Sequence, residues 1–289
     1  MLIAETAAAK INLTLRVLGK RPDGYHQIES LVAFARLGDV LTLDTEQSPG
    51  VETRGPFAAA IDGPNLAEEA LRRLAQEEPR LRLGLIELDK RLPVAAGIGG
   101  GSADAAAVLR VVRQANPARA SVVAWTEIAA GLGADVPVCF EQAPAIMRGL
   151  GEIVVPVARL PRLEVVLVNP QVPVPPNKTA RVFKYLDAPP LGPERRETEF
   201  EGAFSDRAAL LDLMRRTGND LFAPACEVMP DVVAVMSALE KLQGAELVQM
   251  SGAGPTCFAV FETAAGAAGA ADALRGTHPH WWVEAAGIG

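Results

Sequence analysis

Residues 93–104 contain the pattern with the clearest chemistry. They read Pro-Val-Ala-Ala-Gly-Ile-Gly-Gly-Gly-Ser-Ala-Asp, and an alanine-rich segment with helical spacing follows as far as Asn116-Pro117. Glycine lets a backbone approach a ligand closely, and a helix N-terminus offers unpaired N–H groups at the positive end of its dipole. The pattern therefore predicts a site for an anion, most often a phosphate.

Two well-known phosphate-binding loops do not fit this pattern. A P-loop needs Gly-Lys-Ser/Thr after its glycines, whereas Gly101 is followed by Ser102 and Ala103. A dinucleotide-binding fingerprint needs an acidic residue about twenty positions further on, and none lies between Asp104 and Glu127. An NAD-dependent oxidoreductase is thereby disfavoured, while a purely structural glycine turn stays open from the loop alone.

Three further segments carry residue types that a core alone does not require. Lys10 and Asn12 alternate with apolar neighbours, so they share one face of a predicted strand. A Pro-Asp-Gly turn presents Tyr25 and His26 together. Asp135 follows a predicted helix end and enters an apolar run that reads as a strand. Each segment has an ordinary alternative, namely a solvated lysine, an exposed hairpin tip and a carboxylate that accepts N–H bonds in a turn.

The elements that must position these residues are strands and helices. Strands are predicted at 40–43, 81–88, 163–168, 246–250, 256–261 and 281–285, and helices at 66–74 (capped by Asn65), 103–112, 121–132, 178–186, 231–242 and 264–274. Proline and charge dominate 170–202, which predicts loops around the helix at 178–186. The last third predicts a sheet with helices on one face, and a domain boundary is expected near residues 156–162.

Composition bounds the class of protein. The chain has 289 residues, enough for one large domain or two medium ones, and its net charge of −7 argues against nucleic acid or an anionic membrane as the main partner. It contains no apolar run of membrane-spanning length and no secretion signal, and its three widely spaced cysteines are typical of buried thiols. A cytoplasmic enzyme is expected.

The order of the segments carries further information. Residues 9–13, 93–107 and 250–255 resemble the three sequence motifs of the GHMP kinases, a superfamily that includes galactokinase and the homoserine and mevalonate kinases. Residues 21–26 and 133–137 are similar to the branch that acts on a cytidine diphosphate-linked methylerythritol, in the non-mevalonate route to isoprenoid precursors. The resemblance covers nearly the whole chain and makes the ordinary alternatives for these segments much weaker.

The resemblance implies both a fold and a reaction. The implied fold is α+β, a two-domain GHMP kinase fold with a mixed α/β N-terminal domain at residues 1–158 and a ferredoxin-like C-terminal domain at residues 159–289. The implied reaction transfers the γ-phosphoryl group of ATP, with Mg²⁺, to the 2-hydroxyl of the cytidine diphosphate-linked substrate. A homoserine or mevalonate type of kinase is the nearest alternative. A catalytically silent sensor is an alternative from a different class.

The resemblance also implies catalytic and ATP-binding residues. Asp135 matches the base that accepts the hydroxyl proton, and Lys10 matches the cation beside it, which favours the ionised carboxylate. The predicted ATP-binding residues are Pro93, Val94, Ala95, Ala96, Gly97, Ile98, Gly99, Gly100, Gly101, Ser102 and Ala103. Since Ala103-Asp104 departs from the second serine or asparagine frequent in the family, no residue is assigned as a metal ligand.

The predicted substrate-binding residues are those that a cytosine base requires. Tyr25 and Phe183 match the two rings that sandwich the base, and His26 matches the group that contacts its edge. Asn12 and Thr179 match polar contacts to the substrate. The implied partner is thus a small molecule, with no nucleic acid and no membrane, and the chain is expected to be a monomer or a weak homodimer.

Overall fold

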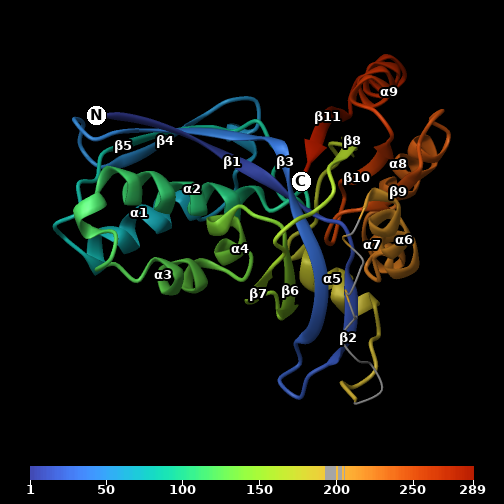
Figure 1. Cartoon of the computed structure of the whole chain (residues 1–289), viewed down its shortest axis with the longest axis horizontal. Helices are drawn as coiled ribbons and strands as arrows, with labels where there is room; N and C mark the ends of the chain where they lie inside the picture. Colours follow the sequence, from blue (N-terminus) through green and yellow to red (C-terminus); the bar gives the residue numbers. More distant parts are fainter. Residues whose placement is uncertain (193–199, 201–203, 205) are drawn as a thin grey trace. The chain divides into compact units, whose positions relative to one another are not determined.

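The computed structural model describes residues 1–192, 200, 204 and 206–289, which fold into two compact units (Figure 1). The first unit contains residues 1–10, 37–94 and 99–142, and the second contains residues 11–36, 95–98 and 143–289. Strands β1 (Leu2–Asn12) and β3 (His26–Asp44) therefore contribute to both units. The predicted boundary between residues 158 and 159 stays a prediction. The part of the predicted loop region at 193–199 and 201–202 lies outside the described residues.

The first unit packs helices against a sheet. Its further elements are β4 (Gly50–Arg54), β5 (Leu85–Asp89), α1 (Leu66–Glu77), α2 (Gly100–Ala115), α3 (Trp125–Leu132), α4 (Val136–Glu141) and the 3-10 turns Ala58–Ala60 and Pro117–Arg119. Strand β5 pairs antiparallel with β3 and parallel with β4. Helices α1 to α4 contact one another and lie below the strands in Figure 1. Alanine and valine make up half of α2, and the continuous run of residues 103–109 is buried, as expected for a helix that packs on more than one side.

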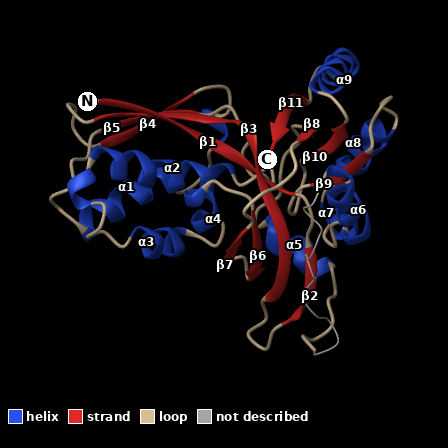
Figure 2. Ribbon diagram, in the orientation of Figure 1, coloured by secondary structure: helices blue, strands red, loops and turns tan. Residues whose placement is uncertain are grey.

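The second unit contains further strands and its own helices. Its further elements are β2 (Arg16–Lys20), β6 (Ala145–Gly149), β7 (Ile153–Pro156), β8 (Leu163–Asn169), β9 (Leu247–Met250), β10 (Cys257–Phe261), β11 (Trp282–Ile288), α5 (Lys178–Tyr185), α6 (Arg207–Thr217), α7 (Phe222–Val228), α8 (Asp231–Glu240) and α9 (Ala264–Thr277). Strands β9, β10, β8 and β11 lie side by side in that order, each antiparallel to its neighbour. Figure 2 shows these strands in red beside the blue helices.

Alternate residues of these strands form the core of the second unit. Val166 and Val168 of β8 share an apolar cluster with Cys257 and Ala259 of β10, because every second side chain of a strand points to the same face. Helices α8 and α9 contribute buried valines, alanines and leucines to the same cluster. The predicted sheet with helices on one face is therefore confirmed for this part of the chain.

Most predicted elements are confirmed, with shifted ends. Asn65 caps α1 as predicted, since its side-chain oxygen accepts the N–H of Ala67 at 3.0 Å. The strand predicted after Asp135 is wrong: residues 136–141 form helix α4. Proline is accepted in the first turn of a helix, where Pro137 lies. A short apolar run has the same sequence pattern in a buried helix as in a buried strand, so periodicity does not distinguish the two.

Cys139 and Cys257 are buried free thiols and Cys226 is half-buried, in agreement with the sequence. Among the residues that the structure describes, none of the helices combines the length and the apolar character that a membrane span requires.

Candidate active site

The ion pair between Lys10 and Asp135 lies in the first unit. The Nζ atom of Lys10, near the end of β1, is 3.2 Å from Oδ2 of Asp135, which precedes α4. The Lys10 side chain is buried, so the solvated-lysine alternative is wrong, whereas the Asp135 side chain keeps 38% of its surface exposed. The Asp135 side chain also makes no capping hydrogen bond to α4. The carboxylate is thus oriented by a cation and open to a ligand, as a general base requires.

The glycine loop reaches this ion pair through Gly99. Gly99 has a φ of +68° and immediately precedes α2, so it takes the left-handed conformation in which glycine is favoured. A Cβ built on Gly99 would lie 3.1 Å from Cβ of Lys10 and 3.3 Å from its Cε. The start of α2, which is the predicted phosphate site, therefore packs closely against Lys10.

The middle of the loop is held in the second unit by the turn at residues 251–254. Gly97 has a φ of +79°, and a Cβ on it would lie 2.6 Å from the carbonyl oxygen of Gly254. The Ser251 hydroxyl donates to the Gly97 carbonyl at 3.0 Å, and Thr256 N–H donates to the Ala96 carbonyl at 3.2 Å. Because the two backbones meet this closely, the turn at residues 251–254 supports the loop as well as joining β9 to β10.

Some of the other loop residues are buried in the core, and some are accessible to solvent. Ala96, Ile98 and Ala103 are buried and fix the loop in the core, together with Pro93. Ala95 and Gly101 are exposed, and Val94, Gly97, Gly99, Gly100 and Ser102 are half-buried. Residues 99–102, around the start of α2, are all half-buried or exposed, so a phosphate can approach the backbone there.

Lys178 is a contact to the loop that the sequence did not predict. Its Nζ atom, on the first residue of α5, donates to the carbonyl of Ala95 at 3.0 Å and to the carbonyl of Gly254. The side chain is buried, and burial lowers the pKa of Lys178 to about 8. A lysine at a helix start reads as a surface residue in sequence, so no local signal reveals this role.

Lys178 should make the stability of the protein depend on pH. An unfolded lysine titrates near pH 10.4, so between about pH 8 and 10 the unfolded chain binds more protons than the folded one, and the folded state gains stability as pH rises. We expect the free energy of unfolding of the wild type, relative to Lys178→Met, to rise by on the order of 2 kcal/mol between about pH 7.5 and 10 in urea titrations. Lys184→Met, an exposed lysine on the same helix, is the control. Parallel pH profiles for the wild type and Lys178→Met would contradict the prediction.

Asn12 is tied to the same turn. Its backbone N–H donates to the Ser251 hydroxyl at 3.1 Å, and its side-chain amide donates to the hydroxyl of Ser30 at 2.7 Å. Asn12 is buried, and it follows Lys10 by two residues on β1. Ser251 is a further functional candidate that the sequence did not predict. The pattern at residues 251–255 indicates a glycine turn but not the contacts of the Ser251 hydroxyl to Asn12 and Gly97.

Two of the predicted substrate-binding rings, His26 and Phe183, lie together in the second unit. The His26 ring stacks on Phe183 of α5, with centroids 5.0 Å apart and an interplanar angle of 22°. Thr179, one turn before Phe183 on α5, is exposed, and the neighbouring Tyr25 ring is 64% exposed. Burial and the nearby charge of Lys20 lower the pKa of His26, so its ring is neutral at pH 7.

Sequence comparisons find similar proteins along nearly the whole chain. Residues 65–147 match the GHMP kinases N terminal domain, and residues 200–280 match the GHMP kinases C terminal domain. A 4-diphosphocytidyl-2-C-methyl-D-erythritol kinase of Paracoccus denitrificans (strain Pd 1222) is 46% identical, covering 98% of this chain and 96% of that protein. One of Rhodopseudomonas palustris (strain ATCC BAA-98 / CGA009) is 44% identical, covering 100% and 98%.

Solved structures give the same result at the level of fold. A crystal structure of 4-(cytidine 5'-diphospho)-2C-methyl-D-erythritol kinase superposes with a TM-score of 0.78 at 32% identity, covering 99% of each chain. A homoserine kinase from Cytophaga hutchinsonii has a TM-score of 0.66 at 18% identity, covering 99% of this chain and 94% of that one. At that identity the likeness concerns the fold alone.

Proposed function

We propose that this chain, which belongs to the GHMP kinase family, transfers the γ-phosphoryl group of ATP to the 2-hydroxyl of 4-diphosphocytidyl-2-C-methyl-D-erythritol. Membership confirms the predicted two-domain α+β fold and the expectation of a kinase. The observation that carries the chemistry is the Lys10–Asp135 ion pair packed against Gly99 of the glycine loop. The substrate follows from relatives that are 42–46% identical over nearly the full chain.

The proposed donor site is the glycine loop and the start of α2. Backbone N–H groups of this segment bind the ATP phosphates, and the positive end of the α2 dipole attracts them. Ser102 adds a hydroxyl, and Lys10 supplies the positive charge that a P-loop would carry within the loop itself. The charge that develops on the transferring group is therefore offset by fixed donors.

The proposed base is Asp135. Its carboxylate accepts the proton of the 2-hydroxyl while the hydroxyl oxygen forms a bond to the γ-phosphorus, and the bond from that phosphorus to the bridging oxygen of ADP breaks. Lys10 lies 3.2 Å from the carboxylate and orients it. Because phosphoryl transfer depends mainly on positioning and charge, this pair supplies what the chain itself must contribute.

The proposed cytidine site is formed by Tyr25, His26 and Phe183, with Asn12 and Thr179 as polar contacts. Aromatic faces stabilise a base by stacking, which is worth about 1–3 kcal/mol per base. A neutral His26 offers one N–H donor and one acceptor nitrogen, which suits the edge of cytosine. Homoserine and mevalonate carry no nucleobase on which an aromatic ring could stack, so these rings favour the cytidine substrate over both.

Mg²⁺ is proposed as the second cofactor. The described residues include no group of three or more histidine, cysteine, aspartate or glutamate side chains that would hold a metal alone. This suits Mg²⁺, which proteins bind through few carboxylates together with substrate phosphates and water. We assign it no protein ligand. A cytoplasmic location, the absence of nucleic-acid binding and a monomeric or weakly dimeric state stay predictions.

One assay tests the proposed function. ADP release is measured with the cytidine diphosphate-linked substrate, with mevalonate and with homoserine at equal concentrations. We expect turnover with the first and little with the others. Turnover of mevalonate or homoserine instead would assign the chain to another GHMP kinase activity, and ATP binding without turnover of any acceptor would favour the silent sensor.

A further inference from the structure

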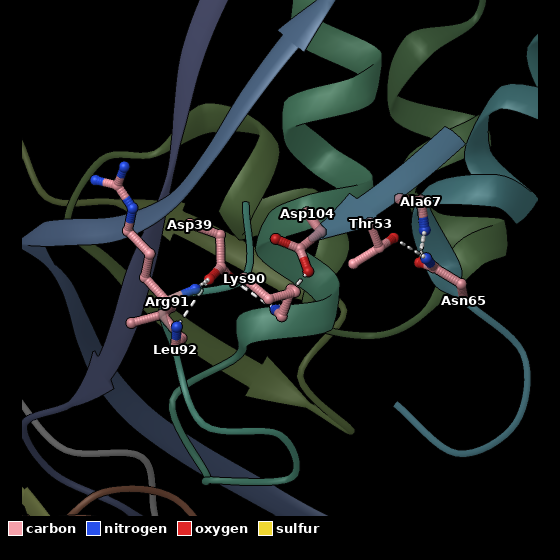
Figure 3. A network of polar contacts seen from close by, with 8 residues as sticks. All are labelled: Asp39, Thr53, Asn65, Ala67, Lys90, Arg91, Leu92 and Asp104. Atoms are coloured by element: carbon pink, nitrogen blue, oxygen red, sulfur yellow. Dashed lines mark hydrogen bonds and ion pairs between the residues drawn. The ribbon is translucent and has the colours of Figure 1, made fainter. Parts of the chain in front are cut away.

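Three ionisable side chains form a buried network in the first unit (Figure 3). The Lys90 ammonium donates to Oδ2 of Asp39 at 2.5 Å and to Oδ2 of Asp104 at 2.7 Å. Asp39 lies on β3, Lys90 follows β5 directly, and Asp104 lies on α2. Each of the three is less than 5% exposed, so the network is shielded from water.

The network holds both ends of the glycine loop. Oδ1 of Asp39 accepts the backbone N–H groups of Arg91 (2.5 Å) and Leu92 (2.8 Å), where the chain leaves β5 and enters the loop. Asp104 lies in α2, which the chain enters at the other end of the loop. Lys90 thus connects the segment before the loop to the helix after it.

The loop also contacts the network. A Cβ built on Gly100, the first residue of α2, would lie 3.6 Å from Nζ of Lys90 and 3.9 Å from Oδ2 of Asp39. An added Cβ would thus make ordinary contacts, so the backbone proposed to receive the phosphates lies next to the lysine and its partner. A change of volume or charge in the network would be transmitted to this backbone.

The two carboxyl groups are not equivalent. Both oxygens of Asp39 accept hydrogen bonds, whereas Oδ1 of Asp104 is buried without a partner among the described residues. Burial raises the pKa of Asp104 to about 8, against the opposing charge of Lys90. The uncharged form of Asp104 is therefore favoured, beside the ion pair of Asp39 and Lys90. A neutral network avoids a net negative charge beneath a loop that binds phosphates.

Stability alone does not explain this arrangement. Burying an ion pair costs desolvation, and apolar replacements of similar volume are often neutral or stabilising. We infer that Asp39, Lys90 and Asp104 are positioning residues, which hold the two ends of the glycine loop in the conformation that binds ATP and do not themselves touch the nucleotide. This inference rests on the proposed kinase function.

Two independent changes break the connection, and direct ATP binding by calorimetry reports the effect. Asp104→Leu removes the acceptor on α2, and the double variant Asp39→Asn/Lys90→Met removes the cation together with its charged partner, which leaves no uncompensated charge on that side. We expect each to raise the Kd for ATP about 10- to 100-fold, as misplaced binding groups do. In the ADP-release assay, the KM for ATP should rise while the KM for the acceptor stays near the wild-type value.

Asp104→Asn is the conservative variant. Its side-chain oxygen can still accept from Lys90, and the amide resembles the uncharged acid in shape. We expect the Kd for ATP to rise only slightly. A loss of ATP binding as large as that of Asp104→Leu would overturn the assignment of Asp104 as the uncharged member.

Asn116→Ala is the matched control at the other end of α2. The Asn116 side chain is buried, accepts the N–H of Arg82 at 2.6 Å and donates to the carbonyls of Arg82 and Val112. Its loss should lower the unfolding midpoint but leave the Kd for ATP unchanged. Weakened ATP binding in Asn116→Ala equal to that of the network variants, or unchanged binding in the network variants, would overturn the inference. Absence of ATP binding by the wild type would instead overturn the proposed function and this inference with it.

Discussion

Replacing Asp135 by asparagine is expected to lower kcat by about 10²- to 10⁴-fold, the range that a positioned general base contributes. Asparagine has the shape of aspartate but does not accept a proton from the acceptor hydroxyl at neutral pH. The fold should survive, because the Asp135 side chain makes no capping hydrogen bond to α4 and remains partly exposed. The Kd for ATP should change little, since the proposed phosphate-binding groups are those of the loop backbone and not Asp135.

The measurement is steady-state ADP release together with calorimetric ATP binding. Glu141→Gln is the matched control, because it makes the same chemical change on an exposed residue at the other end of α4. Glu141→Gln should turn over like the wild type. Near-normal kcat in Asp135→Asn would remove Asp135 from the role of base and leave Lys10 and the loop as the source of catalysis.

Replacing Tyr25 by alanine is expected to raise the KM for the cytidine substrate roughly 5- to 150-fold, equivalent to losing about 1–3 kcal/mol of base stacking. The KM for ATP should stay near the wild-type value, because the predicted ATP-binding residues lie in the loop. The Tyr25 ring is exposed, so its removal should cost little stability.

The chain offers a close control for this variant. It contains two tyrosines, and the second, Tyr185 on α5, is 55% exposed against 64% for Tyr25. Tyr185 lies two residues after Phe183 and so points away from it around the helix. Tyr185→Ala should therefore leave both KM values unchanged. Equal losses of affinity for ATP and the cytidine substrate in Tyr25→Ala would show that the ring supports the fold instead.

Much of the fold was predictable from local patterns. The helices α1, α2, α5, α8 and α9 and the strands β8, β9, β10 and β11 follow from apolar periodicity and from capping or turn residues. Helix α4 was not predictable in this way, because a five-residue apolar run with proline near its start suits a buried strand or a buried helix equally. The length of β3 also escaped prediction, since its residues 29–35 are buried continuously and show no alternation.

The candidate site, too, was only partly predictable from the sequence. The sequence by itself determined the chemical types: a glycine loop without its own lysine, a lysine and an aspartate in separate motifs, and aromatic residues suited to a base. Their roles followed from resemblance to a family rather than from spacing. No spacing rule joins Lys10 to Asp135, because they lie 125 residues apart in the chain and meet only after folding.

Only the tertiary structure decided how the loop is held. Lys178 donates to Ala95 and Gly254, and Lys90 joins Asp39 to Asp104, across separations of 14 to 83 residues. In sequence, each of these lysines reads as a surface charge. Burial changes their role, because an ammonium group removed from water must donate to whatever oxygens surround it. Here those oxygens belong to Ala95 of the glycine loop, to Gly254 of the turn at residues 251–254, and to Asp39 and Asp104.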